Sequence, residues 1–254
     1  MCTIIALHHV HPRYPLVIAA NRDELYARPA SGPQVLVSAP RVVGGKDLER
    51  GGTWMGLSTT PFFVGLTNQR TYQREERPKS RGAIPLEALR RGSMEGARAL
   101  LEEIDPREYR EFNLIYGDGR SLEVAYVRET GVERVALSAG VHVLANDRMG
   151  SPHFPKEQRA RDLVAVDVEP LALRSVLRDR TLPPLDTFPD PPAGTFSKAF
   201  IRELQALCIH TLNYGTRSAT ILWFEPDPLR VGGYLFADGP PDETEFEDHT
   251  ELLR

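Results

Sequence analysis

Short runs of apolar and β-branched residues, separated by turn residues, dominate the first part of the chain. They cover residues 3–9, 15–20, 53–58 and 62–67, with Gly, Pro or Asn residues between them. Runs of this length and composition predict β-strands, and the short connections predict antiparallel hairpins.

The middle of the chain alternates between helical and extended patterns, after a charged loop over residues 70–81. Helices are predicted at 85–91, 93–104, 155–166 and 169–178. Strands are predicted at 112–116, 122–127, 132–136 and 141–145. Ser93 is the expected N-cap of the second helix, because its hydroxyl can accept a hydrogen bond from a free backbone N–H of the first turn.

The last quarter of the chain begins with a proline-rich stretch over residues 181–194, followed by strand patterns at 219–224 and 234–237 and an acidic tail at 242–248. No regular element tolerates so many prolines, so 181–194 is predicted to be a long loop or a lid.

Two clusters of strands with helices between them favour an α+β fold, a four-layer αββα sandwich in which two antiparallel sheets pack face to face and helices cover the outside. With 41% hydrophobic residues, the chain can bury a large core as one sizeable domain or two small ones, and we expect one domain over residues 1–254. One antiparallel sheet with helices on a single face fits the pattern nearly as well.

Charge and hydropathy exclude several classes of partner. The formal net charge is −4, and basic residues are scattered among acidic ones, so neither nucleic acid nor an anionic membrane surface is an expected partner. No stretch reaches the ~18 apolar residues of a membrane span, and no signal peptide pattern is present at the N-terminus. The expected location is therefore cytoplasmic.

The chain has two cysteines, Cys2 and Cys208, which form neither a disulfide framework nor a zinc spacing pattern. Cys208 is expected to be a buried thiol. His8, His9 and His11 cluster near the first hairpin, where His9 and His11 would share a strand face and could bind a metal. No third ligand accompanies that pair, so a surface turn is expected there, and His210 has no identifiable partner. No metal and no cofactor are predicted.

Cys2 stands directly behind Met1, and a residue this small allows the initiator methionine to be removed. The mature chain would then begin with a cysteine whose α-amine has a pKa of ~8 and whose thiol has a pKa of ~8.5, so that one residue holds a nucleophile and its base. The competing interpretation is that Cys2 is a small apolar residue that opens a strand.

Polar residues at 21–24 follow the second predicted strand. A carboxylate such as Asp23 can hold an α-ammonium group, and a guanidinium such as Arg22 favours a thiolate. In a simple hairpin, only sheet curvature or a bulge is expected to bring Asp23 toward Cys2. The alternative is a solvated strand end with a weak surface ion pair.

Seven segments, taken together and in order, carry a family resemblance. They are Met1-Cys2-Thr3-Ile4, Asn21-Arg22-Asp23-Glu24, Gly51-Gly52-Thr53-Trp54-Met55-Gly56, Leu66-Thr67-Asn68, Phe112-Asn113-Leu114, Leu144-Ala145-Asn146 and Tyr214-Gly215-Thr216-Arg217-Ser218. With these motifs the chain resembles the NRDE family, whose eukaryotic namesake is the transport and Golgi organisation protein 2. The resemblance implies the αββα sandwich of N-terminal nucleophile hydrolases.

That fold type includes cysteine amidases such as bile salt hydrolases and penicillin V acylases, and the likeness to them implies catalytic roles. Cys2 would attack an acyl carbonyl, flanked by Arg22 and Asp23, while Asn146 and Asn68 would donate to the oxyanion. The late arginine of those enzymes would be Arg217. In the amidases the arginine and the aspartate are not adjacent, so the carboxylate here is either Asp23 or Glu24.

The remaining polar or aromatic residues of these motifs are the candidate substrate-binding residues, namely Asn21, Glu24, Thr53 and Trp54. Trp54 is equally consistent with a pocket wall and with a core residue.

Two functions follow from the resemblance. The first is hydrolysis of a linear amide or another acyl bond through an acyl-cysteine intermediate, with a small-molecule acyl substrate. The second is a carrier or chaperone that uses the same fold to bind haem, or a lipid or acyl-coenzyme A. The chain contains no Cys-Pro haem dipeptide and no obvious pair of axial histidines.

Overall fold

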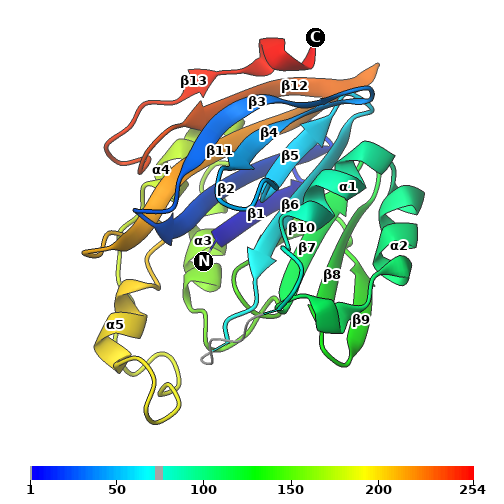
Figure 1. Ribbon diagram of the computed structural model, residues 1–254. Coiled ribbons are helices and arrows are strands. Elements are labelled where there is room, and N and C mark those ends of the chain that lie inside the picture. The colour runs from blue at the N-terminus through cyan, green and yellow to red at the C-terminus, as the bar shows by residue number, and fades with distance from the viewer. Residues whose placement is uncertain (1, 72–76) are drawn as a thin grey trace.

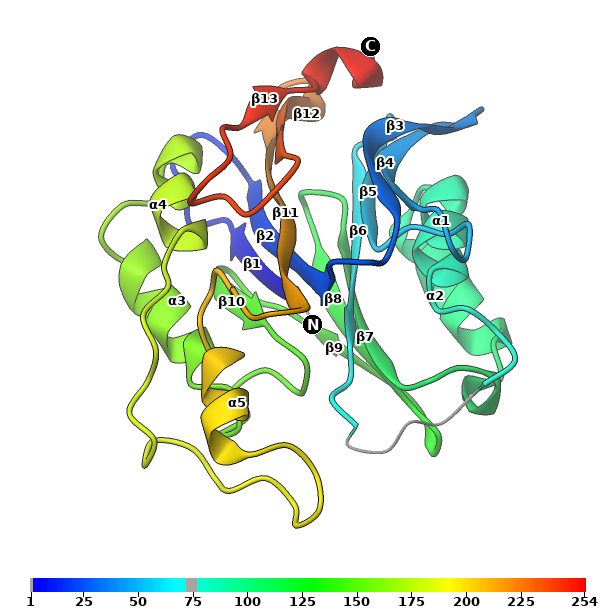
Figure 2. The same ribbon diagram turned by 60° about the vertical axis from the view of Figure 1, so that its left-hand side comes forward.

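Two antiparallel β-sheets packed face to face form the centre of the molecule, and helices cover both outer faces (Figure 1). The computed structural model describes residues 2–71 and 77–254. Figure 2 shows the resulting layers, with α1 and α2 outside one sheet and α3 and α4 outside the other. This arrangement confirms the predicted α+β sandwich, and the single-sheet alternative is wrong.

The first sheet carries the N-terminal strand in its interior, with the strand order β10-β1-β2-β11-β12-β13. Its strands are β1 (Cys2–His8), β2 (Leu16–Leu25), β10 (Gly140–Leu144), β11 (Tyr214–Pro226), β12 (Leu229–Ala237) and β13 (Glu247–Asp248).

The second sheet is a meander in which each strand pairs with the next one along the chain. Its strands are β3 (Ala30–Ser38), β4 (Arg41–Asp47), β5 (Met55–Ser58), β6 (Phe62–Asn68), β7 (Phe112–Gly117), β8 (Leu122–Arg128) and β9 (Gly131–Ala136).

Five α-helices and three short 3₁₀ helices occur in the described residues. The α-helices are α1 (Ala83–Arg91), α2 (Met94–Glu103), α3 (Lys156–Val164), α4 (Leu173–Leu177) and α5 (Lys198–Glu203). The 3₁₀ helices are Pro106–Glu108, Pro170–Ala172 and Thr250–Leu253. Ser93 caps α2 as predicted, since its side chain accepts a hydrogen bond from the Gly96 N–H. None of the helices in the described part of the chain has both the length and the apolar character of a bilayer span.

Three buried clusters hold the layers together. Residues such as Ile4 and Ile18 from the first sheet meet Phe63 from the second sheet between the two sheets. The other two clusters lie under α1 and α2 and under α3 and α4. Burial of such side chains contributes roughly 1.5–3 kcal/mol each, so the layered arrangement follows from the alternating apolar pattern of the strands.

Some elements differ from the sequence prediction. β3 and β4 were not expected, because Pro33 and paired glycines interrupt this stretch; β3 lies at the edge of its sheet, where proline is tolerated. β11 begins earlier than predicted, and α5 follows the proline-rich loop. The acidic tail is not a loose segment, because it contains β13, which pairs with β12. His8 and His11 are buried, so the surface turn expected for the histidine cluster is wrong for those two residues.

Candidate active site

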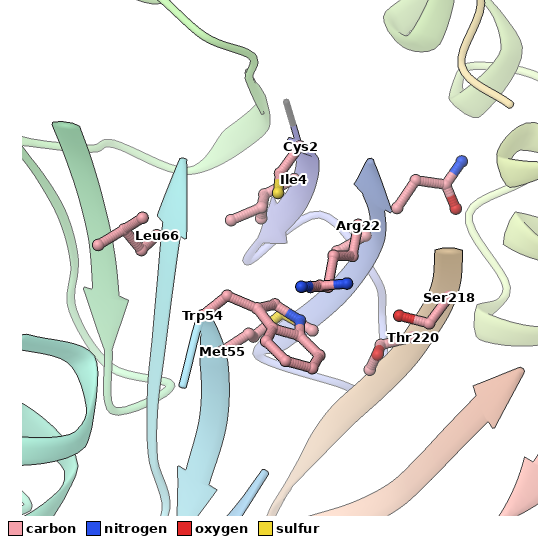
Figure 3. Close-up of a pocket in the computed structure, with 10 residues that line it drawn as sticks. Cys2, Ile4, Arg22, Trp54, Met55, Leu66, Ser218 and Thr220 are labelled. Carbon is pink, nitrogen blue, oxygen red and sulfur yellow. The ribbon is translucent and has the colours of Figure 1, made fainter. Parts of the chain in front are cut away.

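Cys2 and Arg22 face each other at the mouth of a cleft between the two sheets. The register of β1 and β2 pairs Cys2 with Arg22, and directly opposed residues of an antiparallel pair project from the same face of the sheet. Trp54 and Leu66 reach the same cleft from the second sheet (Figure 3). The wider part of the cleft encloses about 590 Å³, counted out to its open mouth.

Residues 21–24 belong to β2 itself, which continues to Leu25, so the expectation that they follow the strand is wrong. Polar side chains occur inside this strand because tertiary contacts accommodate them. Arg22 is 7% exposed, and its guanidinium lies 4.2 Å from the centre of the Trp54 ring. Within residues 2–71 and 77–254, no carboxylate lies within ion-pair distance of Arg22.

Cys2 is partly buried, and burial raises the pKa of its thiol. The charge of Asp23 also raises the pKa of Cys2, whereas the amino terminus, Arg22 and a hydrogen bond from the Asp23 backbone lower it. The thiol therefore needs a base in order to act as a nucleophile at neutral pH.

Asp23 lies one position beyond Arg22 on β2, diagonal to Cys2 and on the side of its backbone nitrogen. The β1–β2 pairing has no register shift, whereas the β11–β2 pairing has one between Thr216 and Ser218, opposite Asp23. Glu24 lies instead near Arg28, at 3.9 Å, so the geometry favours Asp23 over Glu24 as the carboxylate beside the N-terminal amine.

The Asp23 carboxylate is buried on the opposite face of the sheet from Arg22. Thr216 Oγ1 donates a hydrogen bond to Asp23 Oδ1 at 2.7 Å, and Lys156 Nζ lies 3.9 Å from Oδ2. Burial raises the pKa of Asp23 and lowers the pKa of Lys156, while the charge of each opposes its partner's shift. Lys156 was missed in the sequence, where it is one more residue of a charged helix.

Asn146 lies on the other side of Cys2 from Arg22. The β1–β10 register pairs Ile4 with Leu144, and two further residues along each strand lead to Cys2 and Asn146. Asn146 is fully buried, and its side-chain amide donates to the Asn68 carbonyl at 2.7 Å. Asn68 lines the cleft at the end of β6, so this hydrogen bond joins the two sheets beside Cys2.

A buried carboxyl group, Glu157 of α3, holds the turn that carries Asn146. Its two oxygens accept hydrogen bonds from the backbone N–H groups of Ala145 and Gly150, at 3.3 Å and 2.7 Å. Burial raises the pKa of Glu157 to about 7. No sequence pattern indicated this contact, because the Glu157 side chain reaches from the first turn of α3 back to the loop that precedes the helix.

Arg217 does not line the cleft. It lies at a register shift of β11 between Thr216 and Ser218, and its guanidinium donates to the Tyr26 carbonyl. Arg81 lines the cleft together with Arg22 and Arg28, and burial lowers its guanidinium pKa to about 10. In the sequence Arg81 was only the end of a charged loop.

All four candidate substrate-binding residues, Asn21, Glu24, Thr53 and Trp54, line the cleft. The Thr53 hydroxyl donates to the Met55 carbonyl, and the Asn21 amide donates to the carbonyls of Leu177 and Leu207, so these two polar groups hold backbone segments in place.

At the rim of the cleft, the backbone at Gly52 lies very close to the backbone at Gly82. A Cβ atom on Gly52 would lie 2.4 Å from the Gly82 carbonyl carbon, and the Thr53 N–H donates to the Gly82 carbonyl. Only glycine fits at position 52, because a side chain would clash with the Gly82 backbone. No residue of 181–194 lines the cleft, so the lid prediction for this loop finds no support.

The family model described as Transport and Golgi organisation 2 matches residues 1–228. A Transport and Golgi organization protein 2 homolog from Bos taurus is 28% identical over 236 residues, covering 84% of this chain and 83% of that protein.

Two solved structures have a similar fold at low sequence identity. A mutant of conjugated bile acid hydrolase from Clostridium perfringens matches with a TM-score of 0.53 and 11% identity, over 100% of this chain and 94% of that chain. Penicillin V acylase from Agrobacterium tumefaciens matches with a TM-score of 0.52 and 12% identity, over 99% of this chain and 88% of that chain. These matches confirm the predicted fold type, and at such identities they show the fold alone.

Proposed function

The chain belongs to the transport and Golgi organisation 2 family, and from the surroundings of Cys2 we propose that it is a hydrolase that cleaves a linear amide or another acyl bond through an acyl-cysteine intermediate. One observation carries the proposal. Cys2 opens β1 opposite Arg22 at an open cleft, with its backbone nitrogen directed toward the buried Asp23.

The proposed reaction begins once Met1 has been removed and the α-amine of Cys2 is free. This amine takes the thiol proton as the sulfur attacks the acyl carbon, and a C–S bond forms. The Asp23 carboxylate holds the resulting ammonium, and the positive charge of Arg22 favours the thiolate.

The negative charge that develops on the carbonyl oxygen needs fixed donors. Asn68 lines the cleft, and the fully buried Asn146 beside it keeps one amide hydrogen beyond the one it gives to the Asn68 carbonyl. One such donor typically lowers the barrier by about 3 kcal/mol. The C–N bond then breaks, and the leaving amine takes the proton from the ammonium.

Water completes the cycle by attacking the thioester carbon. The α-amine of Cys2 accepts a proton from the water, the C–S bond breaks, and the thiol is restored as the acid leaves. No oxidant, metal or cofactor is required for these steps.

Two arginines of the cleft could bind an anionic acyl substrate, beside the acidic residues Asp23, Glu24 and Asp47 that also line it. Arg28 is paired with Asp47 at 2.6 Å, but within the described ranges neither Arg22 nor Arg81 has a carboxylate at ion-pair distance. Two guanidinium groups in one cleft are suited to a carboxylate or a phosphate on the substrate.

The carrier alternative uses the same cleft, with a bound haem, lipid or acyl-coenzyme A in place of a substrate. No histidine of the described residues lines the cleft, so imidazole ligation of haem there has no candidate residue. The cytoplasmic location and the small-molecule partner stay predictions.

Intact-mass spectrometry tests the hydrolase proposal. The purified protein should lack Met1 and should gain a single acyl adduct from a thiol-directed acyl donor. Cys2→Ala should abolish the adduct, whereas Cys208→Ser, which removes the other thiol, should retain it.

Retention of Met1, or an adduct that survives Cys2→Ala, would overturn the mechanism. A saturable Soret shift on haemin titration, together with no Cys2-dependent adduct, would favour the haem carrier instead.

A further inference from the structure

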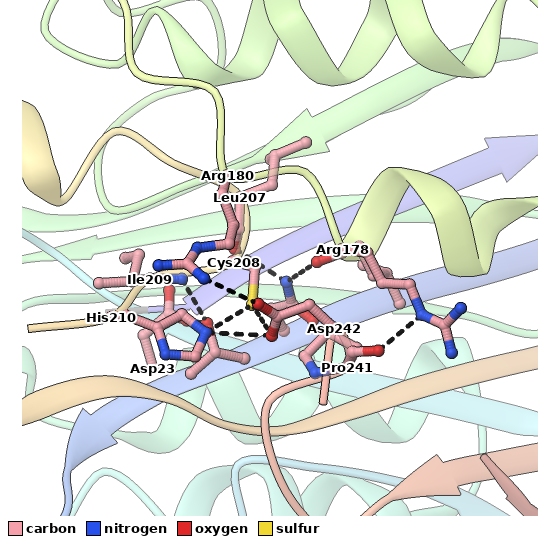
Figure 4. Close-up of polar contacts among 12 residues, drawn as sticks. Asp23, Arg178, Arg180, Leu207, Cys208, Ile209, His210, Pro241 and Asp242 are labelled. Carbon is pink, nitrogen blue, oxygen red and sulfur yellow. Dashed lines mark hydrogen bonds and ion pairs between the residues drawn. The ribbon is translucent and has the colours of Figure 1, made fainter. Parts of the chain in front are cut away.

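Three side chains with metal-binding atoms meet on the side of β2 that faces away from the cleft (Figure 4). Cys208 and His210 lie in the segment before β11, and Asp242 lies between β12 and β13. Cys208 Sγ lies 3.6 Å from His210 Nε2 and 3.1 Å from Asp242 Oδ1, and His210 Nε2 lies 3.0 Å from the same oxygen. Neither the sequence nor the proposed reaction assigns a role to this cluster.

We propose that Cys208, His210 and Asp242 form a binding site for one tetrahedral transition-metal ion of the Zn²⁺ type. With the bond lengths of zinc to sulfur, nitrogen and oxygen, ligand atoms of a tetrahedral site lie about 3.4–3.6 Å apart. The sulfur–nitrogen separation already has this value, and the other two need to lengthen by about half an ångström or less. A thiolate, an imidazole and a carboxylate form a donor set that binds zinc in preference to magnesium or calcium.

The exposure of the three residues suits a site with three protein ligands and one solvent ligand. Cys208 is 1% exposed and closes the inner side, whereas the side chains of His210 and Asp242 are 21% and 15% exposed. An ion can therefore enter from solvent, and a water molecule can complete the tetrahedron.

The charges also balance on metal binding. The Cys208 thiol now donates its hydrogen to Asp242, so binding releases this proton and the ion takes its place. The thiolate and the carboxylate then neutralise a divalent ion. Arg180 lies 3.4 Å from the second Asp242 oxygen, where it orients the carboxylate from outside the ligand shell.

An ion at this site would fix the support behind Asp23. The Leu207 carbonyl accepts from Asn21, and the Ile209 N–H donates to Thr216 Oγ1, which in turn donates to Asp23. The metal would therefore tie the C-terminal segment to the rear of β2. The proposal concerns binding and does not depend on the hydrolase mechanism.

Cobalt binding tests the site directly, because a thiolate bound to Co²⁺ gives a charge-transfer absorption band. In Cys2→Ser protein, where Cys208 is the remaining thiol, Co²⁺ should produce this band with saturation at one equivalent, and Zn²⁺ should displace it. In Cys208→Ser protein, which keeps Cys2, the band should be absent.

Partly exposed ligands provide variants that are expected to fold. His210→Gln and Asp242→Asn should each weaken Co²⁺ binding at least about 10-fold, with an unchanged circular dichroism spectrum. The proposal is wrong if no thiolate band appears in Cys2→Ser protein, if the band survives Cys208→Ser, or if both of these variants bind Co²⁺ as tightly as the parent.

Discussion

The two cysteines lie on opposite sides of β2, and their neighbours differ in charge. Cys2 faces the cleft with the Arg22 guanidinium, whereas Cys208 is buried behind the strand and donates to the Asp242 carboxylate. Burial raises the pKa of both thiols, but Arg22 favours the thiolate of Cys2 and Asp242 opposes that of Cys208. Under the two proposals, the same thiol group attacks a carbonyl in one region and binds a metal ion in the other.

Strand alternation creates this division. Arg22 projects to the cleft, while its neighbours Asn21 and Asp23 project to the helix-covered side, where they contact Leu207 and Thr216. A single strand therefore supplies groups to both regions, and the following predictions test how separate the two regions are.

Thiol alkylation is expected to show the largest difference between the regions. Without added metal, iodoacetamide should modify Cys2 about 10³- to 10⁴-fold faster than Cys208, because the buried thiol reacts only after local opening. Peptide mass spectrometry over a time course measures both rates. In concentrated urea the two rates should become similar, and comparable rates in the native protein would contradict the comparison.

Removal of one member of the buried Asp23–Lys156 ion pair behind β2 should strongly lower the free energy of unfolding. Lys156→Met removes the buried ammonium group 3.9 Å from Asp23 and should destabilise the protein by about 3–5 kcal/mol, as measured by urea unfolding. The double variant Asp23→Asn/Lys156→Met should recover most of this loss. A single variant as stable as the parent would show that the pair does not hold β2 against α3.

Glu157, which lies on the Asn146 side of the cleft, should make the free energy of unfolding depend on pH. Its pKa is about 7 when folded against 4.5 for the ordinary group, so its stabilising contribution is complete below pH 4.5 and is lost as the pH rises through 7. The stability of Glu157→Gln relative to the parent should therefore rise by about 3 kcal/mol between pH 4 and pH 8. Urea unfolding at several pH values measures this.

The exposed Glu243→Gln is the matched control, and its stability relative to the parent should stay nearly constant over the same range. A flat difference for Glu157→Gln as well would contradict the raised pKa.

Asn68→Ala should separate attack from oxyanion stabilisation in the cleft region. If Asn68 donates to the oxyanion, acylation of Cys2 should slow about 10²-fold while alkylation of Cys2 by iodoacetamide stays unchanged. Asn213→Ala, an exposed asparagine outside the cleft, should change neither rate. Equal loss of both rates in Asn68→Ala would indicate disturbed packing around Cys2.

The sequence indicated most of the regular elements, because apolar periodicity is a local property of the chain. It missed β3 and β4, where Pro33 and the glycines of β4 obscure the pattern, and it ended β2 before residues 21–25. Polar residues inside a strand resemble a strand end unless their partners are known. For Asp23, those partners are Thr216 and Lys156, which are distant in the chain.

The sequence by itself predicted most of the strands and helices, because apolar periodicity is local, and its family resemblance implied the sandwich fold and a role for Arg22 beside Cys2. Only the tertiary structure decided which arginines line the cleft, since Arg81 does and Arg217 does not. It also decided that Cys208, His210 and Asp242 meet. The physical reason is that these contacts join segments brought together by sheet packing, and no spacing along the chain records which side chains then face one another.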